Sequence, residues 1–316
     1  MLLFLGRRCV GIASVLVGIA IVTFVVVQLI PGDPARVLAG PEAPPEALAQ
    51  ARRELGLDRP LAVQFGHYFG RLVRGDLGVS VATRRPVFAD LLDRYPATIE
   101  LTVASLVASA LIGIPLGTAA AVGRGRWLDH VTRLVALFGM SLPTFWLGLV
   151  LQWVFYGELG WLPVGSRAPW SRPGEAMLHM VLPTITLSTV TLALLMRITR
   201  SAMLETLPQA FITTARSKGL SEWRVIGVHA LRNAGPVIFT VIGLRLGTLF
   251  GGAVLTETVF SWPGVGLYAV HAVESKDFPA IVGFTLTLAF LYTAINLFVD
   301  ISYGWLDPRM SQQDAS

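Results

Sequence analysis

Six long apolar stretches constrain the fold of this chain more than any other feature. They cover Cys9–Ile30, Leu101–Val122, Leu134–Tyr156, Ala176–Met196, Ala234–Thr256 and Phe278–Val299. Each stretch reaches the roughly 18–25 residues that are needed to cross about 30 Å of hydrocarbon. In lipid a helix satisfies all of its own backbone hydrogen bonds, so we expect six membrane-spanning helices. The sequence therefore predicts an all-α polytopic membrane protein.

The composition agrees with a location in a lipid bilayer. The 316 residues are 53% hydrophobic and only 14% charged, whereas soluble domains carry roughly 25% charged residues. The net charge of +5 suits a membrane surface or nucleic acid. Because the basic residues adjoin the apolar stretches, we expect the lipid bilayer as a partner and no nucleic acid. The single cysteine, Cys9, and the scattered histidines match no metal-site spacing, so we expect no metal and no cofactor.

The positions of the basic residues predict the orientation, because short cytoplasmic loops carry an excess of lysine and arginine. The side of the N-terminus and the loops on that side hold Arg7, Arg8, Arg124, Arg126, Arg133, Arg197, Arg200, Arg216, Lys218, Arg224 and Arg232. The two short loops of the opposite side hold only Arg167, Arg172 and Lys276. We therefore expect both termini to be cytoplasmic, including a tail over residues 305–316.

The segment between the first two spans, Pro31–Tyr95, predicts a small helical subdomain outside the cytoplasm. We expect a helix over Pro45–Leu55 that is closed by Gly56, and a second helix that begins near Pro60. A third helix is expected over Val87–Arg94, directly after a proline. The subdomain either packs as a cap on the membrane helices or docks an external partner, and the sequence leaves both readings open.

The basic loop over residues 205–233, between the fourth and fifth spans, is the most specific element of the sequence. The heptapeptide at its centre reads Thr214, Ala215, Arg216, Ser217, Lys218, Gly219 and Leu220. We expect a short helix that ends at Gly219, and a second over Glu222–Asn233 with Ser221 as its N-cap. The loop is either an ordinary amphipathic hairpin or the place where a soluble partner moves the membrane helices.

In these residues, and in fragments spread over nearly the whole chain, the sequence resembles the permeases of binding-protein-dependent ABC importers, in particular the dipeptide/oligopeptide/nickel group. The fragments include Gly32-Asp33-Pro34, Pro143-Thr144-Phe145-Trp146-Leu147, Trp262-Pro263-Gly264-Val265-Gly266 and Asp307-Pro308-Arg309. Each fragment is weak alone, but their order and spacing are specific. The chain departs from the family pattern at Thr213, where an acidic residue is usual, so we assign no salt bridge there.

The resemblance implies a type I importer fold in the bacterial plasma (inner) membrane. Residues 1–94 would form the N-terminal span and the extracytoplasmic segment, and residues 95–304 the permease core with its coupling loop, residues 205–233. The implied partners are a homologous second permease subunit, two cytoplasmic ABC ATPase subunits and an extracytoplasmic solute-binding protein. The heptapeptide would contact the ATPase. The chain lacks the Gly-x-x-x-x-Gly-Lys-[Ser/Thr] phosphate loop, so it is not expected to be an enzyme.

The resemblance further implies that the chain forms, with its second subunit, the membrane pathway for di- or oligopeptides. Within the family the alternative solute is nickel or a metal chelate of the metallophore type. A secondary transporter is an alternative from another class, but it would show inverted repeats and a charged midplane site. A membrane scaffold is compatible with the composition but gives no reason for the heptapeptide.

Two charged residues of the fifth span are candidates for the pathway or its gate. Arg245 lies in mid-span, where an isolated charge is costly and marks a functional site by default. It either pairs with Glu257, with Asp300 or with a neighbouring subunit, or it faces a water-filled cavity. Glu257, near the outer end of the span, either gates the outer mouth or lies at the wet interface.

Overall fold

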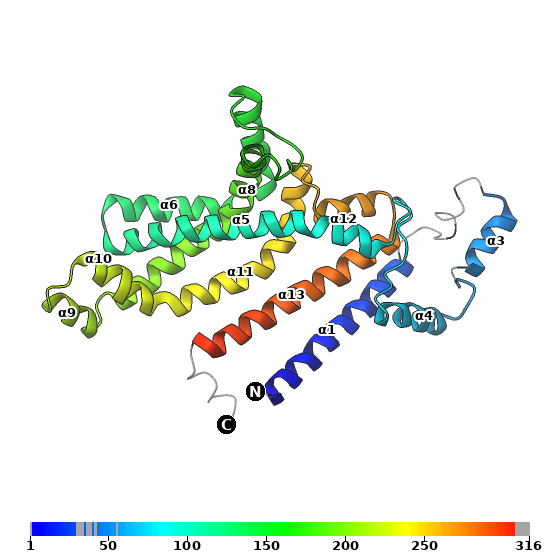
Figure 1. Cartoon of the computed structure of the whole chain (residues 1–316), viewed down its shortest axis with the longest axis horizontal. Coiled ribbons are helices and arrows are strands. Elements are labelled where there is room, and N and C mark those ends of the chain that lie inside the picture. The colour runs from blue at the N-terminus through cyan, green and yellow to red at the C-terminus, as the bar shows by residue number, and fades with distance from the viewer. Residues whose placement is uncertain (1, 30–34, 36–39, 41–42, 55, 307–316) are drawn as a thin grey trace. The chain divides into compact units, whose positions relative to one another are not determined.

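The computed structural model describes residues 2–29, 35, 40, 43–54 and 56–306, and the regular structure of these residues is helical (Figure 1). The one pairing of extended backbone among them is an isolated antiparallel bridge between Val79 and Pro86. The chain forms two compact units: residues 1–96 with 263–293, and residues 97–262 with 294–316.

The first unit holds the N-terminal helix and the short helices that follow it. Its elements are α1 (Leu2–Leu29), α3 (Pro45–Glu54), α4 (Leu61–Val73), the start of α5 (Val87–Val122), α12 (Val265–Glu274) and the start of α13 (Phe278–Leu306). The predicted helices of the segment after the first span are confirmed, although Leu55 itself lies outside the described residues. Gly56 follows with a φ of +66°, and Pro60 directly precedes α4. The Phe24 ring of α1 packs on Phe65 of α4, with centroids 5.3 Å apart.

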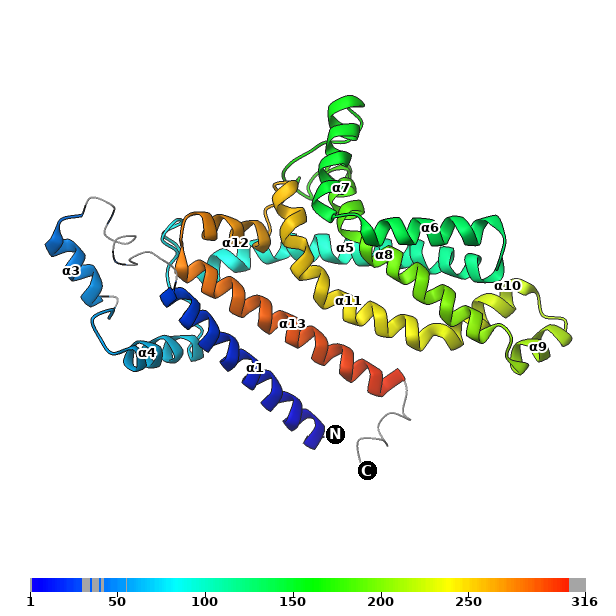
Figure 2. The ribbon, with the colours of Figure 1, turned by 180° about the vertical axis from the view of Figure 1, so that it is seen from behind.

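The second unit is a bundle in which α8 is central. Its elements are the rest of α5, α6 (Trp127–Ser141), α7 (Thr144–Leu151), the π-helix η1 (Gln152–Glu158), α8 (Pro173–Thr206), α9 (Ala210–Ser217), α10 (Glu222–Arg224), the π-helix η2 (Val225–Ala230), α11 (Leu231–Val259) and the end of α13. Helix α8 packs against α6, α7 and α11 (Figures 1 and 2). Helices α9 and α10 lie at the end of this bundle that is remote from η1.

Several of the predicted spans are continuous helices. Helical segments long and apolar enough to cross a membrane cover Val87–Val122, Pro173–Thr206, Glu222–Val259 and Phe278–Val299. They contain the second, fourth, fifth and sixth predicted stretches. Helix α1 contains the first stretch apart from Ile30, which lies outside the described residues, and its described apolar part runs from Val10 to Val26.

The prediction of one straight helix over Leu134–Tyr156 is wrong. Helix α6 ends at Ser141, α7 begins at Thr144, and the two are bent by 101°. Pro143 lacks a backbone N–H and disfavours the helical conformation of the residue before it. Leu142 accordingly has a ψ of 130°. The stretch is therefore a broken span or a re-entrant element.

Two predicted helix boundaries are also wrong. Helix α5 does not end at Arg94 but continues through Pro96 to Val122, and the helix predicted to end at Asn233 continues into α11 without a break. In α5, Val87 and Leu91 lie in the buried core of the first unit, and Ala97 and Leu101 lie in that of the second. Burial of apolar side chains on both sides of the proline offsets the loss of the backbone hydrogen bond that the proline cannot make.

Candidate functional site

The heptapeptide ends α9 in a Schellman motif. Gly219 has a φ of +76°, a conformation that glycine adopts without the steric cost of a Cβ atom. Its N–H donates to the Arg216 carbonyl at 2.9 Å, and the Leu220 N–H donates to the Ala215 carbonyl at 3.4 Å. These two hydrogen bonds satisfy carbonyls at the helix end. The prediction that Gly219 terminates the helix is confirmed.

One side of α9 is fixed to the rest of the second unit. Ile212 and Ala215 are buried, and they belong to a hydrophobic cluster with Met203 of α8 and with Val225 and Ala230 of η2. Close-packed side chains transmit displacements. We therefore expect a displacement of α9 to reach α8 and, through η2, α11.

The other side of the heptapeptide is open to solvent. Thr214, Arg216, Ser217, Lys218 and Gly219 are exposed, and Leu220 is half-buried. Two large aromatic side chains next to the heptapeptide are exposed as well: Phe211 is 41% exposed and Trp223 is 83% exposed. Neither ring is among the predicted site residues. Exposed tryptophan is enriched among the residues that dominate protein–protein binding, so this surface has the character of a docking site.

An ion pair closes the turn on its solvent side. The Arg216 Nε donates to Glu222 Oε1 at 2.8 Å, and its Nη2 donates to Glu222 Oε2 at 3.3 Å. Ser221 occupies the N-cap position of α10, as expected, but its side chain makes no capping hydrogen bond. The pair thus takes part in fixing α10 to the end of α9.

Glu257 is buried, with 0% of its surface exposed, so it does not lie at a wet interface in this chain. Thr98 Oγ1 of α5 donates to Glu257 Oε1 at 2.5 Å. Five residues further along, the buried Trp262 indole donates to the Ala97 carbonyl at 2.9 Å. The C-terminal end of α11 and the Trp262 that follows it are thereby joined to α5 by two buried hydrogen bonds.

Arg245 is half-buried near the middle of α11. It lies on the same continuous helix as Glu257, and about 18 Å of helix rise separates the two residues. Of the alternatives left open for Arg245, a pairing with Glu257 of the same chain is therefore ruled out. The side chain of Asp300, the other predicted partner within the chain, lies outside the described residues. The ion pairs among the described residues do not include Arg245.

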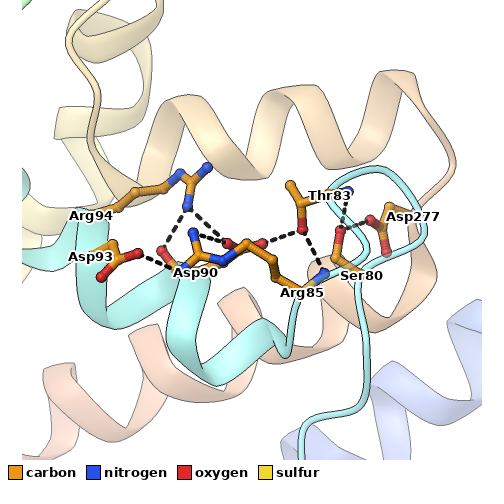
Figure 3. Close-up of polar contacts among 7 residues, drawn as sticks. All are labelled: Ser80, Thr83, Arg85, Asp90, Asp93, Arg94 and Asp277. Atoms are coloured by element: carbon orange, nitrogen blue, oxygen red, sulfur yellow. Dashed lines mark hydrogen bonds and ion pairs between the residues drawn. The ribbon is translucent and has the colours of Figure 1, made fainter.

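A buried carboxylate network in the first unit was not predicted (Figure 3). Asp90 of α5 is buried, and its Oδ1 lies 3.1 Å from Arg85 Nη1 and 3.4 Å from Arg94 Nη1. Its Oδ2 accepts a hydrogen bond from Thr83 Oγ1 at 2.5 Å. The Arg94 guanidinium also lies over the Tyr268 ring, 4.6 Å from the centroid. The arrangement ties the loop before α5 to α5 and to α12.

Asp277, directly before α13, anchors the same loop from the other side (Figure 3). Its buried carboxylate accepts hydrogen bonds from Ser80 Oγ at 2.5 Å, from the Ala82 N–H at 3.1 Å and from the Ala280 N–H at 3.2 Å. Burial, with the nearby Asp90 and Asp277 carboxylates, raises the pKa of Tyr268 to about 12, so this phenol stays neutral. The sequence signal was an aspartate at the N-cap position of an apolar helix.

Metal and cofactor sites were not expected, and the described residues contain no group of three or more histidine, cysteine, aspartate or glutamate side chains that could hold a metal ion. Asp129 is a buried carboxylate of the second unit. Its Oδ1 accepts a hydrogen bond from Arg200 Nε at 2.6 Å, and its Oδ2 accepts one from Arg200 Nη2 at 3.0 Å. The heptapeptide of this part of the chain thus forms an exposed turn at the end of a helix whose other side is buried in the bundle.

Comparisons with known proteins show the family of the chain. Residues 113–312 match the family described as "Binding-protein-dependent transport system inner membrane component", and residues 1–102 match its N-terminal counterpart. Relatives align almost end to end. "Probable D,D-dipeptide transport system permease protein DdpB" of Escherichia coli K12 is 46% identical over 98% of this chain and 97% of its own length.

Two further relatives are each 40% identical over 98% of this chain and 99% of their own length. They are "Dipeptide transport system permease protein DppB" of Alkalihalophilus pseudofirmus and "Glutathione transport system permease protein GsiC" of Salmonella choleraesuis. Among solved structures, a chain of the inward-facing MetNI methionine ABC transporter shares the fold, with a TM-score of 0.55 and 19% identity over 69% of this chain and 96% of its own. The chain belongs to the family of inner membrane components of binding-protein-dependent transport systems, the permease subunits of ABC importers.

Proposed function

We propose that this protein forms, with a homologous second permease, the membrane pathway of an ATP-driven importer of di- or oligopeptides. The observation that carries the proposal is its similarity, over nearly its whole length, to permeases named for D,D-dipeptide, dipeptide and glutathione transport. The relatives named above include no nickel permease, so peptides are favoured over nickel or a metallophore.

The heptapeptide Thr214–Leu220 contacts a cytoplasmic ABC ATPase. Three features of the described residues support this assignment: the exposed turn at Gly219, the exposed aromatic rings of Phe211 and Trp223, and the buried face of α9. Two such ATPase subunits close and open as they bind and hydrolyse ATP. Because Ile212 and Ala215 are packed against α8 and η2, we expect that motion to move the membrane helices as rigid bodies.

The chain crosses the bacterial inner membrane six times, with both termini in the cytoplasm. Helix α1 supplies the first crossing, and the bent pair α6 and α7, with η1, supplies the third. The helices α3 and α4 then belong to a subdomain outside the cytoplasm, where an external solute-binding protein delivers the peptide. The basic loops beside Arg124 and Arg216 support this orientation, since positive residues are retained on the cytoplasmic side.

The proposal is tested with the complete importer in proteoliposomes. The complex contains this chain, the second permease and both ATPases, and it receives a dipeptide bound to the binding protein. We expect uptake to require ATP on the ATPase side and to stop when the lysine of the ATPase phosphate loop is replaced. Dipeptide uptake by this chain without any ATPase would contradict the proposal and favour a secondary transporter. ATP-driven nickel uptake without peptide uptake would favour the other solute.

A further inference from the structure

Arg245 lies at the centre of the apolar stretch Ala234–Thr256. At 1.5 Å of rise per residue it is about 16 Å from either end of this stretch, which exceeds the length of an arginine side chain. The guanidinium therefore cannot reach either layer of lipid headgroups along the helix, as a basic residue near a span end does. A charge at this depth needs water or a counter-ion.

The buried or partly buried acidic residues described in the second unit are engaged elsewhere. Arg200 holds Asp129 at 2.6 Å, and Arg167 holds Glu100 at 2.6 Å. Glu257 accepts a hydrogen bond from Thr98, about 18 Å of helix rise away from Arg245. The counter-ion of Arg245 is thus absent from the described side chains of its own bundle, although the residue is half-buried.

The exposed face of α11 next to Arg245 is less apolar than a typical lipid-facing surface. It carries Thr248, Gly251, Gly252 and Thr258, together with Leu244 and Leu255. The exposed face of α5, in contrast, carries Ile99, Val103, Val107 and Leu111. The hydroxyls of Thr248 and Thr258 donate to carbonyls of α11 itself, at 3.0 and 2.8 Å. The hydroxyl protons are thus satisfied in any surroundings, while the free lone pairs and the small glycines give water or a polar solute access to this face.

We propose that Arg245 is a carboxylate-binding site halfway along the pathway, and that it takes the free C-terminal carboxylate of the transported peptide. The inference rests on the proposed function, since it requires that peptides pass this face. A guanidinium offers a planar pair of donors that matches the two oxygens of a carboxylate. It would lower the cost of bringing that anion to the centre of the membrane, and a single half-buried cation holds it weakly enough to release it.

The experiment compares a dipeptide with its C-terminally amidated analogue in the complete importer. Both peptides are first shown to bind the binding protein, which is then supplied loaded and at saturation. We expect Arg245→Gln to lower the initial uptake rate of the free acid roughly tenfold, as for the loss of a charge-assisted hydrogen bond. Uptake of the amide should stay close to that of the unmodified complex, and Arg245→Lys should be intermediate. Arg197→Gln, which removes an exposed arginine of α8, is the matched control and should leave the selectivity between the two peptides unchanged.

Three results would overturn the inference. An equal loss for both peptides would mean that Arg245 supports the structure and does not bind solute. The same selective loss in Asp300→Asn would identify Asp300 as its partner instead. An unchanged rate for both peptides would place Arg245 off the pathway. If the unmodified complex imports neither peptide, the proposed function fails first, and this inference fails with it.

A second measurement does not depend on the choice of peptide. In a chain with Cys9→Ser, an Arg245→Cys side chain should react with a water-soluble thiol reagent in the assembled complex. A cysteine at Ile238, which is 4% exposed on the same helix, should not react. Equal reactivity at the two positions, or no reaction at position 245, would contradict a water-accessible site.

Discussion

The Arg216 guanidinium lies 2.8 Å from the Glu222 carboxylate, across the turn that is made by Gly219. The side chains are 45% and 60% exposed, so the pair contributes little to the global stability. It instead restricts the orientation of α10 relative to α9, at the surface where we place the ATPase contact.

Exchange of the two charges tests this restriction. We predict that Arg216→Glu lowers peptide uptake several-fold, because it sets two carboxylates against each other at the turn. The double variant Arg216→Glu with Glu222→Arg should recover most of the uptake, and the thermal midpoint of the complex should change little in both. A double variant as defective as the single one would mean that Arg216 contacts the ATPase directly and not through Glu222.

We predict that the Asp277 carboxylate is essential for the folded conformation of the loop before α5. Asp277→Ala leaves the Ser80 hydroxyl and the N–H groups of Ala82 and Ala280 without their acceptor. Ser80 and Ala280 are buried, and each buried donor left unsatisfied costs about 1–3 kcal/mol. Trypsin should then cleave faster at Arg84 and Arg85 in the solubilised complex. Asp93→Asn, which removes an exposed pair with Arg85, serves as the control, and equal cleavage of the two variants would refute the prediction.

Close packing between α5 and α8 depends on Gly117. A Cβ atom at this position would lie 2.5 Å from the Met196 carbonyl oxygen and 2.8 Å from Thr199 Cβ. We predict that Gly117→Ala destabilises the protein by about 1–3 kcal/mol, as overpacking does, and lowers the thermal midpoint of the complex in detergent. Gly66→Ala, where a Cβ atom meets nothing within 4 Å, should have no such effect. A normal midpoint for Gly117→Ala would contradict the packing.

Thiol labelling tests the orientation. In a chain with Cys9→Ser, we predict that Val73→Cys, at the exposed last residue of α4, is labelled from outside by a membrane-impermeant reagent. Ser217→Cys in the heptapeptide should be labelled only after the membrane is made permeable. Equal labelling of Ser217→Cys in intact cells would reverse the orientation that the basic loops predict.

Local signals allowed much of the fold to be predicted from the sequence. Apolar length located the spans, Pro60 and Gly56 located short helices, and Gly219 located the turn of the heptapeptide. Each of these features depends on residues that are close together in the chain. The break at Pro143 has a local signal as well, because a proline stands within the predicted third span. The apolar length of the stretch, from which the span is predicted, does not show that break.

The polar contacts that join distant parts of the chain could not be predicted in the same way. Thr98 and Glu257 are 159 positions apart, and Ser80 and Asp277 are 197 positions apart. The periodicity of apolar residues shows which face of a helix is apolar. It does not show which hydroxyl donates a hydrogen bond to which buried carboxylate. The continuity of α5 through Pro96 has the same origin, since it depends on burial by residues far along the sequence.

The central claim is that the turn at Gly219 transmits the work of an ATPase to the membrane helices. Its φ of +76° suits glycine and asparagine but is strongly unfavourable for a β-branched residue. Gly219→Val and Gly219→Asn add side chains of similar size, and no atom of the chain lies within 4 Å of the added Cβ. The two variants therefore differ mainly in whether the turn can form.

The most direct measurement is the rate of ATP-driven peptide uptake by complexes that carry these two variants, each normalised to the amount of assembled permease. We predict that Gly219→Val is inserted normally but loses uptake together with the stimulation of the ATPase by loaded binding protein, while Gly219→Asn retains most of both. Normal uptake by Gly219→Val with its full complement of ATPase would contradict the account, because the heptapeptide would then be an ordinary cytoplasmic turn.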